Sequence, residues 1–375
     1  MIDYQPALKI AYGLRSDAFT KSGGDSGKVQ KYVEALNAKG HAATIFTDAT
    51  KLKKCGDRFD LIHIFNTQTP YENAPYLRFA QSSGTPLVIS PIHHQKSFME
   101  SYFNKLPRGR LFSYQSYMFV SSLAKEVLLK KSAPSVDWLS LPDQINRKLL
   151  IEASRVFPLS NSELRQLEAD LGMKIDQNKV IIVPNGLTFR EPQEQLRTID
   201  VLVVGRIEPR KNMLKIARTL SNSSYRVTFV GKANANHPRY NQEFLSVIAS
   251  SENLTYEGER DQLALADLYS RSHVCLSNSW FEVVSQVDLE AVSLGCKPIV
   301  SRASAIFDYF DGDVLSLLPD CTAEDLIETV KLAMSPDYSP SLRESYVHDW
   351  TSVVEMLVAA YHQVRTSSAR PEIAH

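Results

Sequence analysis

The chain contains 375 residues, in which 42 Lys and Arg residues are balanced by 42 Asp and Glu residues, and 43% of the residues are hydrophobic. Charge balance argues against a nucleic-acid-binding protein, and the hydrophobic content argues against a disordered one. The charge is unevenly divided: residues 1–190 carry a net +8 (25 basic, 17 acidic) and residues 191–375 a net −8 (17 basic, 25 acidic). A chain of this length usually forms two domains, and the sign changes where a boundary is expected.

The cysteines and the N-terminal sequence predict a cytoplasmic protein. The cysteines lie far apart without a CxxC pair, which is typical of free thiols in a reducing compartment. The residues after Met1 form neither the basic nor the apolar region of a signal peptide, and no apolar run approaches the roughly 18 residues of a membrane-spanning helix.

Short apolar runs alternate with longer segments of helical period in the first half of the chain. The runs predict strands, and the longer segments predict helices between them. The expected strands are 8–14, 42–46, 61–65, 87–90, 156–160 and 180–184. The expected helices are 26–39, 73–82, 111–131 and 162–171.

The same alternation restarts after the polar stretch 188–198. The expected strands are 201–205, 226–231, 254–258, 274–277 and 298–301, and the expected helices are 213–221, 240–250, 261–271 and 284–294. This pattern predicts an α/β fold with two doubly wound parallel sheets, in domains at 1–190 and 198–345. Ligands of such sheets bind at the carboxyl ends of the strands.

A glycine-rich loop connects the first expected strand to the first expected helix. Gly23 and Gly24 belong to the sequence SGGDSG at 22–27. Backbone N–H groups at such a helix start can bind a phosphate or a sugar hydroxyl. The loop has neither the GxGxxG spacing nor the Walker Lys-Ser/Thr pair, so an ordinary connecting loop is an equal alternative.

Two cations follow the first expected strand of the second half. Gly205 ends that strand, and Arg206 and Lys211 lie on the loop after it. An arginine can grip a diphosphate with two hydrogen bonds, and a lysine supplies a compact charge. A solvated charged loop is the alternative interpretation of these residues.

Two glutamates, Glu282 and Glu290, are separated by seven residues near the expected helix 284–294. Eight helical steps would place them roughly 12 Å apart, farther than the about 5–9.5 Å between the carboxylates of a glycosidase. We expect them to bind opposite ends of an elongated ligand, Glu282 at a sugar and Glu290 at a ribose. The N–H groups of Val283, Val284 and Ser285 would open the helix and face a diphosphate. A pair of surface glutamates is the alternative.

The order of these motifs resembles that of the retaining glycosyltransferases of family 4, which have the GT-B fold. The order runs from the Gly-Gly loop through Val183-Pro184-Asn185-Gly186 and Gly205-Arg206 to the two glutamates, and spans nearly the whole chain. Gly40-His41, Gly258 and Asp349-Trp350 fit the same pattern. The resemblance implies two Rossmann-like domains facing each other across a cleft, with a C-terminal helix at 346–368 that returns to the N-terminal domain.

The resemblance also implies roles for the residues named above. The C-terminal domain would bind a nucleotide-diphosphate sugar through Arg206, Lys211, Glu282 and Glu290, and the N-terminal domain would bind the acceptor. Gly23 and Gly24 would line the cleft. A histidine after the fourth strand often faces the sugar in this family, and of the adjacent His93 and His94 we favour His93.

The chain departs from the family in the turn after the first glutamate. Val283 and Val284 stand where a glycine is common, which leaves Ser285 as the small residue with a hydroxyl donor. Gln286 stands where an apolar residue is usual, so the sequence does not indicate which nucleotide base is bound.

Asp311-Gly312-Asp313 matches a manganese-binding pattern of another glycosyltransferase fold, but it lies in an acidic turn. Positive side chains and a helix N-terminus can act on the leaving diphosphate instead, so we expect no metal and no cofactor.

The stretch 96–131 carries seven cations and two anions. Aromatic residues are interleaved with these charges: Phe98, Tyr102, Phe103, Phe112, Tyr114, Tyr117 and Phe119. This composition suits an anionic membrane surface or a lipid-linked acceptor, and aromatic residues packed in the core are the equal alternative.

The whole sequence therefore predicts a metal-independent, retaining glycosyltransferase in the cytoplasm, peripheral on the inner face of the cell membrane. It would move a sugar to a hydroxyl of a glycan or lipid-linked acceptor, in polysaccharide or glycolipid biosynthesis. A nucleotide-sugar epimerase of the GT-B fold and a non-catalytic partner subunit are the alternatives.

Overall fold

The structure, a computed structural model, describes residues 6–19, 24–124, 137, 140–188 and 195–368. The chain divides into two compact units. The first unit contains Met1–His93, Phe103–Gly186 and Trp350–His375, and the second contains His94–Tyr102 and Leu187–Asp349. The expected boundary near residue 190 placed residues 94–102 in the first domain, whereas their contacts group them with the second unit.

The first unit is built on a five-stranded parallel sheet with the order β2-β1-β3-β4-β5. Its strands are β1 (Lys9–Gly13), β2 (Ala42–Phe46), β3 (Leu61–Phe65), β4 (Leu87–Ser90) and β5 (Arg155–Val156). These strands match the expected apolar runs, although β5 is shorter. The strand expected at 180–184 does not form: only Val180 makes a bridge, to Val156, because β5 ends there.

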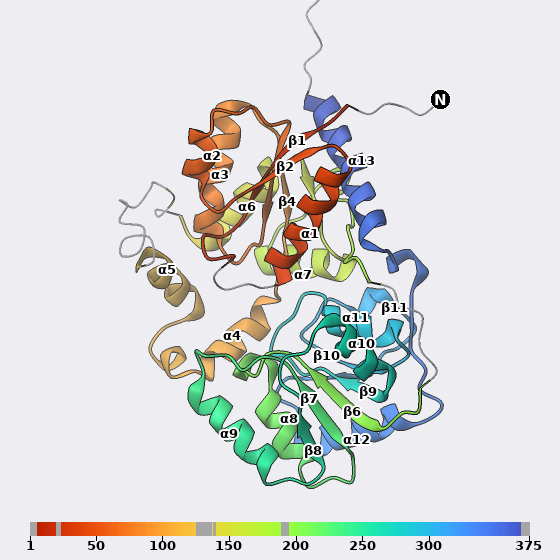
Figure 1. Ribbon diagram of the computed structural model, residues 1–375. Coiled ribbons are helices and arrows are strands. Elements are labelled where there is room, and N and C mark those ends of the chain that lie inside the picture. The colour runs from red at the N-terminus through yellow and green to blue at the C-terminus, as the bar shows by residue number, and fades with distance from the viewer. Residues whose placement is uncertain (1–5, 20–23, 125–136, 138–139, 189–194, 369–375) are drawn as a thin grey trace, which may run out of the picture. The chain divides into compact units, whose positions relative to one another are not determined.

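Helices cover both faces of this sheet (Figure 1). On one face, α1 (Gly24–Ala38) and α13 (Trp350–Ser368) pack against Ile10, Tyr12 and Val88. The opposite face, which presents Ala11, Ile62 and Ile89, is covered by further helices. These are α2 (Ala49–Lys54), α3 (Pro70–Ser83), α6 (Pro142–Glu152) and α7 (Asn161–Leu171). Between β4 and α6 the chain also forms α4 (Lys96–Asn104), η1 (Pro107–Arg110) and α5 (Tyr114–Ala124).

The second unit contains a six-stranded parallel sheet with the order β12-β10-β9-β6-β7-β8. Its strands are β6 (Ile199–Val204), β7 (Val227–Val230), β8 (Leu254–Tyr256), β9 (Ser272–Leu276), β10 (Lys297–Ser301) and β12 (Ser316–Leu317). One face packs against α8 (Met213–Leu220), α9 (Pro238–Ala249) and α12 (Ala323–Met334), and the other against α10 (Gln262–Ser270) and α11 (Gln286–Ser293). A short antiparallel pair joins β11 (Phe310–Asp311) to β13 (Ser341–Leu342).

Strand order defines where a ligand would bind in the second unit. The chain moves outward from β6 to β7 and β8, and then returns to the other side of β6 to form β9. At such a reversal the connections after the two central strands separate, which opens a crevice at their carboxyl ends. The loops after β6 and β9 carry Gly205–Lys211 and Ser279–Ser285, respectively. The fold therefore brings most of the expected donor-site residues to one edge.

Candidate functional site

Two glycines shape the carboxyl ends of β6 and β7. A Cβ atom at Gly231 (φ 142°) would lie 2.0 Å from the carbonyl oxygen of Gly205. A Cβ atom at Gly205 (φ 154°) would lie 2.9 Å from Met213 Cε. A contact of 2.0 Å with backbone is sterically forbidden, so only glycine fits at 231. The close approach fixes the start of the loop that carries the cations.

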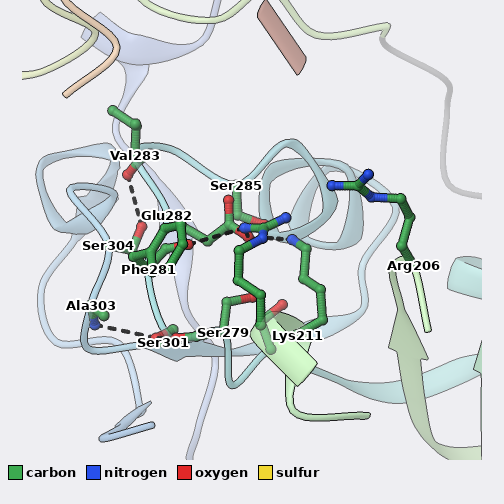
Figure 2. Close-up of polar contacts among 12 residues, drawn as sticks. Arg206, Lys211, Ser279, Phe281, Glu282, Val283, Ser285, Ser301, Ala303 and Ser304 are labelled. Atoms are coloured by element: carbon green, nitrogen blue, oxygen red, sulfur yellow. Dashed lines mark hydrogen bonds and ion pairs between the residues drawn. The ribbon is translucent and has the colours of Figure 1, made fainter. Parts of the chain in front are cut away.

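A cluster of two cations and one carboxylate lies at this edge. Glu282 accepts a hydrogen bond from the Lys211 ammonium (Figure 2) and another from Arg210 Nη1 at 3.0 Å. Arg210 also donates to the Phe281 carbonyl oxygen at 3.1 Å, and its guanidinium lies 5.4 Å from the centroid of the Phe281 ring. Both cations belong to the short turn η5 (Pro209–Lys211), so they reach the same carboxylate. Lys211 and Glu282 are thus brought together, and Arg210, which sequence reasoning missed, joins them.

The charged groups of this cluster shift each other's pKa. Burial would raise the pKa of the Glu282 carboxyl, but the charges of Lys211 and Arg210 outweigh burial and hold that pKa well below its usual range. Burial would lower the pKa of Arg210, but Glu282 and Glu208 outweigh it and raise that pKa. Glu282 and Arg210 are therefore both charged at neutral pH.

Glu208 is a buried carboxylate beside the cluster. It accepts hydrogen bonds from Arg210 Nε at 3.1 Å and from Asn234 Nδ2 at 2.7 Å, and lies 3.2 Å from Arg206 Nη2. The Arg206 side chain is 49% exposed, and Figure 2 shows it apart from the Lys211–Glu282 pair. Arg206 is thus more exposed than Arg210, whose side chain is 21% exposed.

Asn212 joins the cation turn to the loop after β9. Its backbone is left-handed (φ 56°), and its Nδ2 donates to the Asn278 carbonyl at 2.8 Å and to the Pro319 carbonyl at 2.8 Å. Its Oδ1 accepts from Trp280 Nε1 at 3.0 Å. One buried amide therefore holds the loop that carries Glu282 at a fixed distance from the turn that carries Lys211.

The loop before α11 corrects the expected arrangement of the two glutamates. The Glu282 N–H donates to the Ala303 carbonyl at 2.9 Å, and the Val283 carbonyl accepts from the Ala305 N–H at 2.6 Å. The Val283 carbonyl also accepts from Ser304 Oγ at 2.9 Å (Figure 2). Since α11 begins only at Gln286, Glu282 lies outside the helix and the separation of roughly 12 Å does not apply.

Ser285 is the N-cap of α11 rather than part of its first turn. Its Oγ accepts from the Asp288 N–H at 3.4 Å. Helix α11 therefore begins after the three residues that the sequence predicts to open it, and Val283, Val284 and Ser285 precede its first turn. The side chains of Val283 and Val284 are buried.

Asp288, on the first turn of α11, is a buried carboxyl that sequence reasoning missed. Its Oδ1 accepts from Ser277 Oγ at 2.5 Å, and its side chain is 1% exposed. Burial raises the pKa of Asp288 to about 7, against the hydrogen bonds from Ser277 and Ser285 that lower it. Glu290, farther along α11, accepts a hydrogen bond from the Tyr269 hydroxyl at 3.4 Å.

The structure separates the two adjacent histidines. His93 belongs to the first unit and is 6% exposed. Its Nδ1 lies 3.0 Å from Thr67 Oγ1, its Nε2 lies 2.8 Å from Asp170 Oδ2, and its N–H donates to Glu163 Oε1 at 2.6 Å. Both ring nitrogens are thus occupied, which argues against the preference for His93 as the residue that faces a sugar.

His94 belongs to the second unit. Its ring packs edge-on against Phe281 with 5.1 Å between centroids, and its charge acts to lower the pKa of Glu282. Tyr102, at the other end of the segment, contacts Phe281 and Trp280 at 5.7 and 5.8 Å. The segment 94–102 therefore forms part of the surroundings of Glu282.

The remaining expected site residues are the glycines of the first loop and the acidic turn. Gly24 is the first residue of α1, and Gly23 lies outside the described residues. Asp311 pairs with Arg343 at 3.2 Å. In the part of the chain that the structure describes, no group of three or more His, Cys, Asp or Glu side chains could hold a metal ion. Nor is any helix there long and apolar enough to cross a membrane.

Comparison with solved structures shows the fold. Sucrose-phosphate synthase from Thermosynechococcus elongatus is 14% identical, with a TM-score of 0.72, over 96% of this chain and 100% of that chain. The Anabaena protein HepE, in complex with UDP and glucose, is 12% identical with a TM-score of 0.61, over 96% and 98% of the chains. The catalytic domain of starch synthase IV from Arabidopsis thaliana, bound to ADP and acarbose, is 14% identical with a TM-score of 0.59, over 96% and 100%.

These similarities confirm the expected fold class. The chain has the α/β architecture of the GT-B fold. Neither a protein-family model nor a curated protein sequence matches the chain.

Proposed function

We propose that the chain is a retaining glycosyltransferase of the family 4 type, which moves a sugar from a nucleotide-diphosphate sugar to an acceptor hydroxyl. The observation that carries this proposal is the pairing of Arg210 and Lys211 with Glu282 at the carboxyl edge of the second sheet. Charged groups held in place before a ligand arrives need little reorganisation during a reaction.

The cluster carries a surplus of positive charge for a diphosphate. Arg206, Arg210 and Lys211 supply three positive charges, and Glu208 and Glu282 supply two negative ones. Arg206 is the most exposed of the three cations and would meet the diphosphate first. Lys211 would then exchange part of its contact with Glu282 for a phosphate oxygen, which frees Glu282 to accept from the sugar hydroxyls.

The reaction that we propose is a displacement on one face of the sugar. A departing phosphate oxygen would accept the proton of the acceptor hydroxyl, while Arg206 and Lys211 stabilise the negative charge that develops on the diphosphate. Glu290 would accept from the ribose hydroxyls. We propose that no metal takes part, because the cations and the start of α11 can stabilise the same charge.

Of the two histidines, His94 is the better candidate for a contact with the transferred sugar. It lies against Phe281, next to Glu282 in the sequence, whereas both ring nitrogens of His93 have partners within the first unit. This arrangement leaves His94 as the histidine available to the epimerase alternative, which requires acid and base groups beside the sugar.

The acceptor that we propose is a glycan or a lipid-linked sugar, bound by the first unit. The reaction would then belong to polysaccharide or glycolipid biosynthesis on the cytoplasmic side of a membrane. Direct transfer to the acceptor hydroxyl, rather than a glycosyl-enzyme intermediate, is part of this proposal.

Binding and transfer test this proposal in sequence. A thermal-shift screen with UDP, GDP and ADP should raise the unfolding temperature with at least one of them, because a ligand of the native state stabilises it. With the matching nucleotide sugar, Lys211→Ala should lower kcat about a hundredfold, the usual effect of losing one contact to a developing negative charge. Lys331→Ala is the control, since Lys331 is 71% exposed on α12.

Three outcomes would contradict the proposal. Near-normal transfer by the Lys211 variant would show that this cation is outside the reaction. Interconversion of a nucleotide sugar without any acceptor would indicate an epimerase. The failure of all three diphosphates to bind would favour a non-catalytic subunit.

A further inference from the structure

The turn before α5 exposes apolar and basic side chains together. Leu111 is 78% exposed and Phe112 is 46% exposed, directly after Arg108 and Arg110, which are both exposed. Val120, on α5, is 50% exposed. We call the run from Arg108 to Phe112 the basic–apolar turn.

Within the described part of the stretch 96–131, the large apolar side chains that are exposed lie in this turn and on α5. Residues 96–102 belong to the second unit, and residues 125–131 lie outside the described residues. Of the aromatic residues that motivated the membrane interpretation, Phe112 alone is exposed and Phe103 is buried. The exposed apolar surface comes from Leu111 and Val120 as well, which composition did not single out.

One side of α5 holds the helix to the first unit. Tyr114 and Tyr117 contact Phe103, with ring centroids 5.7 and 5.0 Å apart. Phe119 contacts Tyr71 at 6.2 Å. The other side presents Ser113, Ser116, Val120 and Ala124, which are exposed and uncharged. The helix is therefore anchored along one side and open along the other.

The turn is also fixed in its conformation. A Cβ atom at Gly109 would lie 2.2 Å from the Phe103 carbonyl oxygen, so glycine alone allows this approach. The Arg108 guanidinium lies 4.8 Å from the centroid of the Tyr117 ring. Leu111 and Phe112 are thus displayed on a turn whose backbone and neighbours hold it in place.

The charges around the turn identify the partner. Residues 101–124 contain Lys105, Arg108 and Arg110 and no Asp or Glu. Exposed leucine and phenylalanine beside arginines fit the interface of a bilayer, where apolar side chains enter the acyl region and guanidinium groups meet lipid phosphates. A protein partner offers no such uniform sheet of phosphates above an apolar layer.

We propose that the basic–apolar turn and the open side of α5 dock on the surface of an anionic membrane. The proposal goes beyond the transfer reaction, since it depends on residues of the first unit that take no part in the Glu282 cluster. Docking would bring the chain to membrane-borne substrates whatever chemistry it performs on them.

Vesicle co-sedimentation of the full chain tests the proposal. We expect binding to vesicles of phosphatidylcholine with phosphatidylglycerol, and much weaker binding to phosphatidylcholine alone. The double substitution R108E/R110E should lower the partition coefficient on anionic vesicles by about tenfold or more, because each arginine contributes near the surface. The double substitution L111S/F112S should lower it on both vesicle types, with an unchanged unfolding temperature because both side chains are exposed.

Matched controls lie in the second unit. R218E/K331E reverses two exposed cations, and L263S changes a leucine that is 67% exposed, so both should retain vesicle binding. Lys211→Ala should also retain it, so that failure of docking and failure of the transfer reaction can be told apart.

Three results would overturn the proposal. The first is wild-type protein that stays in the supernatant with anionic vesicles at low salt. The second is a loss of binding by the controls as large as that of the turn variants. The third is a dimer in sedimentation equilibrium that L111S/F112S converts to a monomer without any effect on vesicle binding, since a second copy would then cover the turn.

Discussion

One glutamate in each unit, Glu163 in the first and the partly buried Glu282 in the second, illustrates opposite surroundings for a carboxylate. Glu163, in the first unit, is fully buried and accepts the backbone N–H groups of His93 and Leu159, each at 2.6 Å. Glu282, in the second unit, accepts from Arg210 and Lys211. Burial raises the pKa of Glu163 above its ordinary value, despite those backbone hydrogen bonds. The pKa of Glu282 is lowered, because two cations outweigh its burial.

The difference shows what each carboxylate contributes. Two neutral N–H donors fix the position of Glu163 and hence the backbone at His93, but they do not fully compensate a buried charge. Two cations compensate the charge of Glu282, and Glu282 in turn keeps both cations in one place. We infer that Glu163 is a positioning residue, whereas Glu282 maintains an ionic site that a charged ligand can enter.

The largest expected effect comes from removing the charge of Glu282. Glu282→Gln would leave Arg210 and Lys211 close together without their carboxylate, which should cost about 3 kcal/mol or more of unfolding free energy. Urea unfolding measures this cost at pH 7. Glu243→Gln is the control, because Glu243 pairs with Arg218 at the surface and should cost less than about 1 kcal/mol. Equal costs for the two variants would contradict the comparison.

Asp288 tests whether the cations that lower the pKa of Glu282 also keep the pKa of another carboxyl in the second unit low. Its folded pKa of about 7 lies above the ordinary value of 3.8, so the native state binds the extra proton and wild-type stability should fall as pH rises from 5 to 8. Relative to Asp288→Asn, which does not titrate, wild type should lose roughly 2–3 kcal/mol over this range. Unfolding free energies of both proteins at pH 5 and pH 8 give the difference. A constant difference across this range would show that Asp288 is ionised throughout.

The smallest effect is expected at Glu163. Glu163→Gln keeps one acceptor oxygen but turns an amide NH₂ toward a backbone N–H, which should cost about 1–3 kcal/mol. The pH dependence distinguishes it from Glu282. Stability contributed by Glu163 is lost as pH rises through its raised pKa, and stability contributed by Glu282 is lost as pH falls below 4.5. Urea unfolding of each variant and of wild type across the acidic range should therefore show slopes of opposite sign.

Local patterns predicted the elements of the fold well. The run 61–65 is a strand because all five of its residues are buried between covered faces. The helix expected at 261–271 begins after Asp261, whose side chain accepts from the Ala264 N–H at 2.9 Å. The strand predicted at 180–184 does not form, although its composition is strand-like. Its neighbour β5 has only two residues, so Val180 alone of the run makes a bridge.

The site was predicted less completely, because its geometry depends on contacts between distant residues. Nothing local indicates that Arg210 rather than Arg206 reaches Glu282, since this depends on the turn η5 and the left-handed Asn212. Glu163 contacts His93 across 70 residues, and no spacing rule covers that contact. Adjacent histidines cannot be assigned to different units from sequence alone.

The helix α13 has a consequence for how the chain is made. It supplies Val353, Leu357 and Tyr361 to the core of the first unit, and the Tyr361 hydroxyl lies 2.6 Å from His63 Nδ1 and 2.8 Å from the Tyr12 hydroxyl. A ribosome delivers the N-terminus first, yet this core stays unfinished until the last helix has emerged. Every residue of the second unit has left the ribosome before then. The unit that begins the chain is therefore the last to be completed.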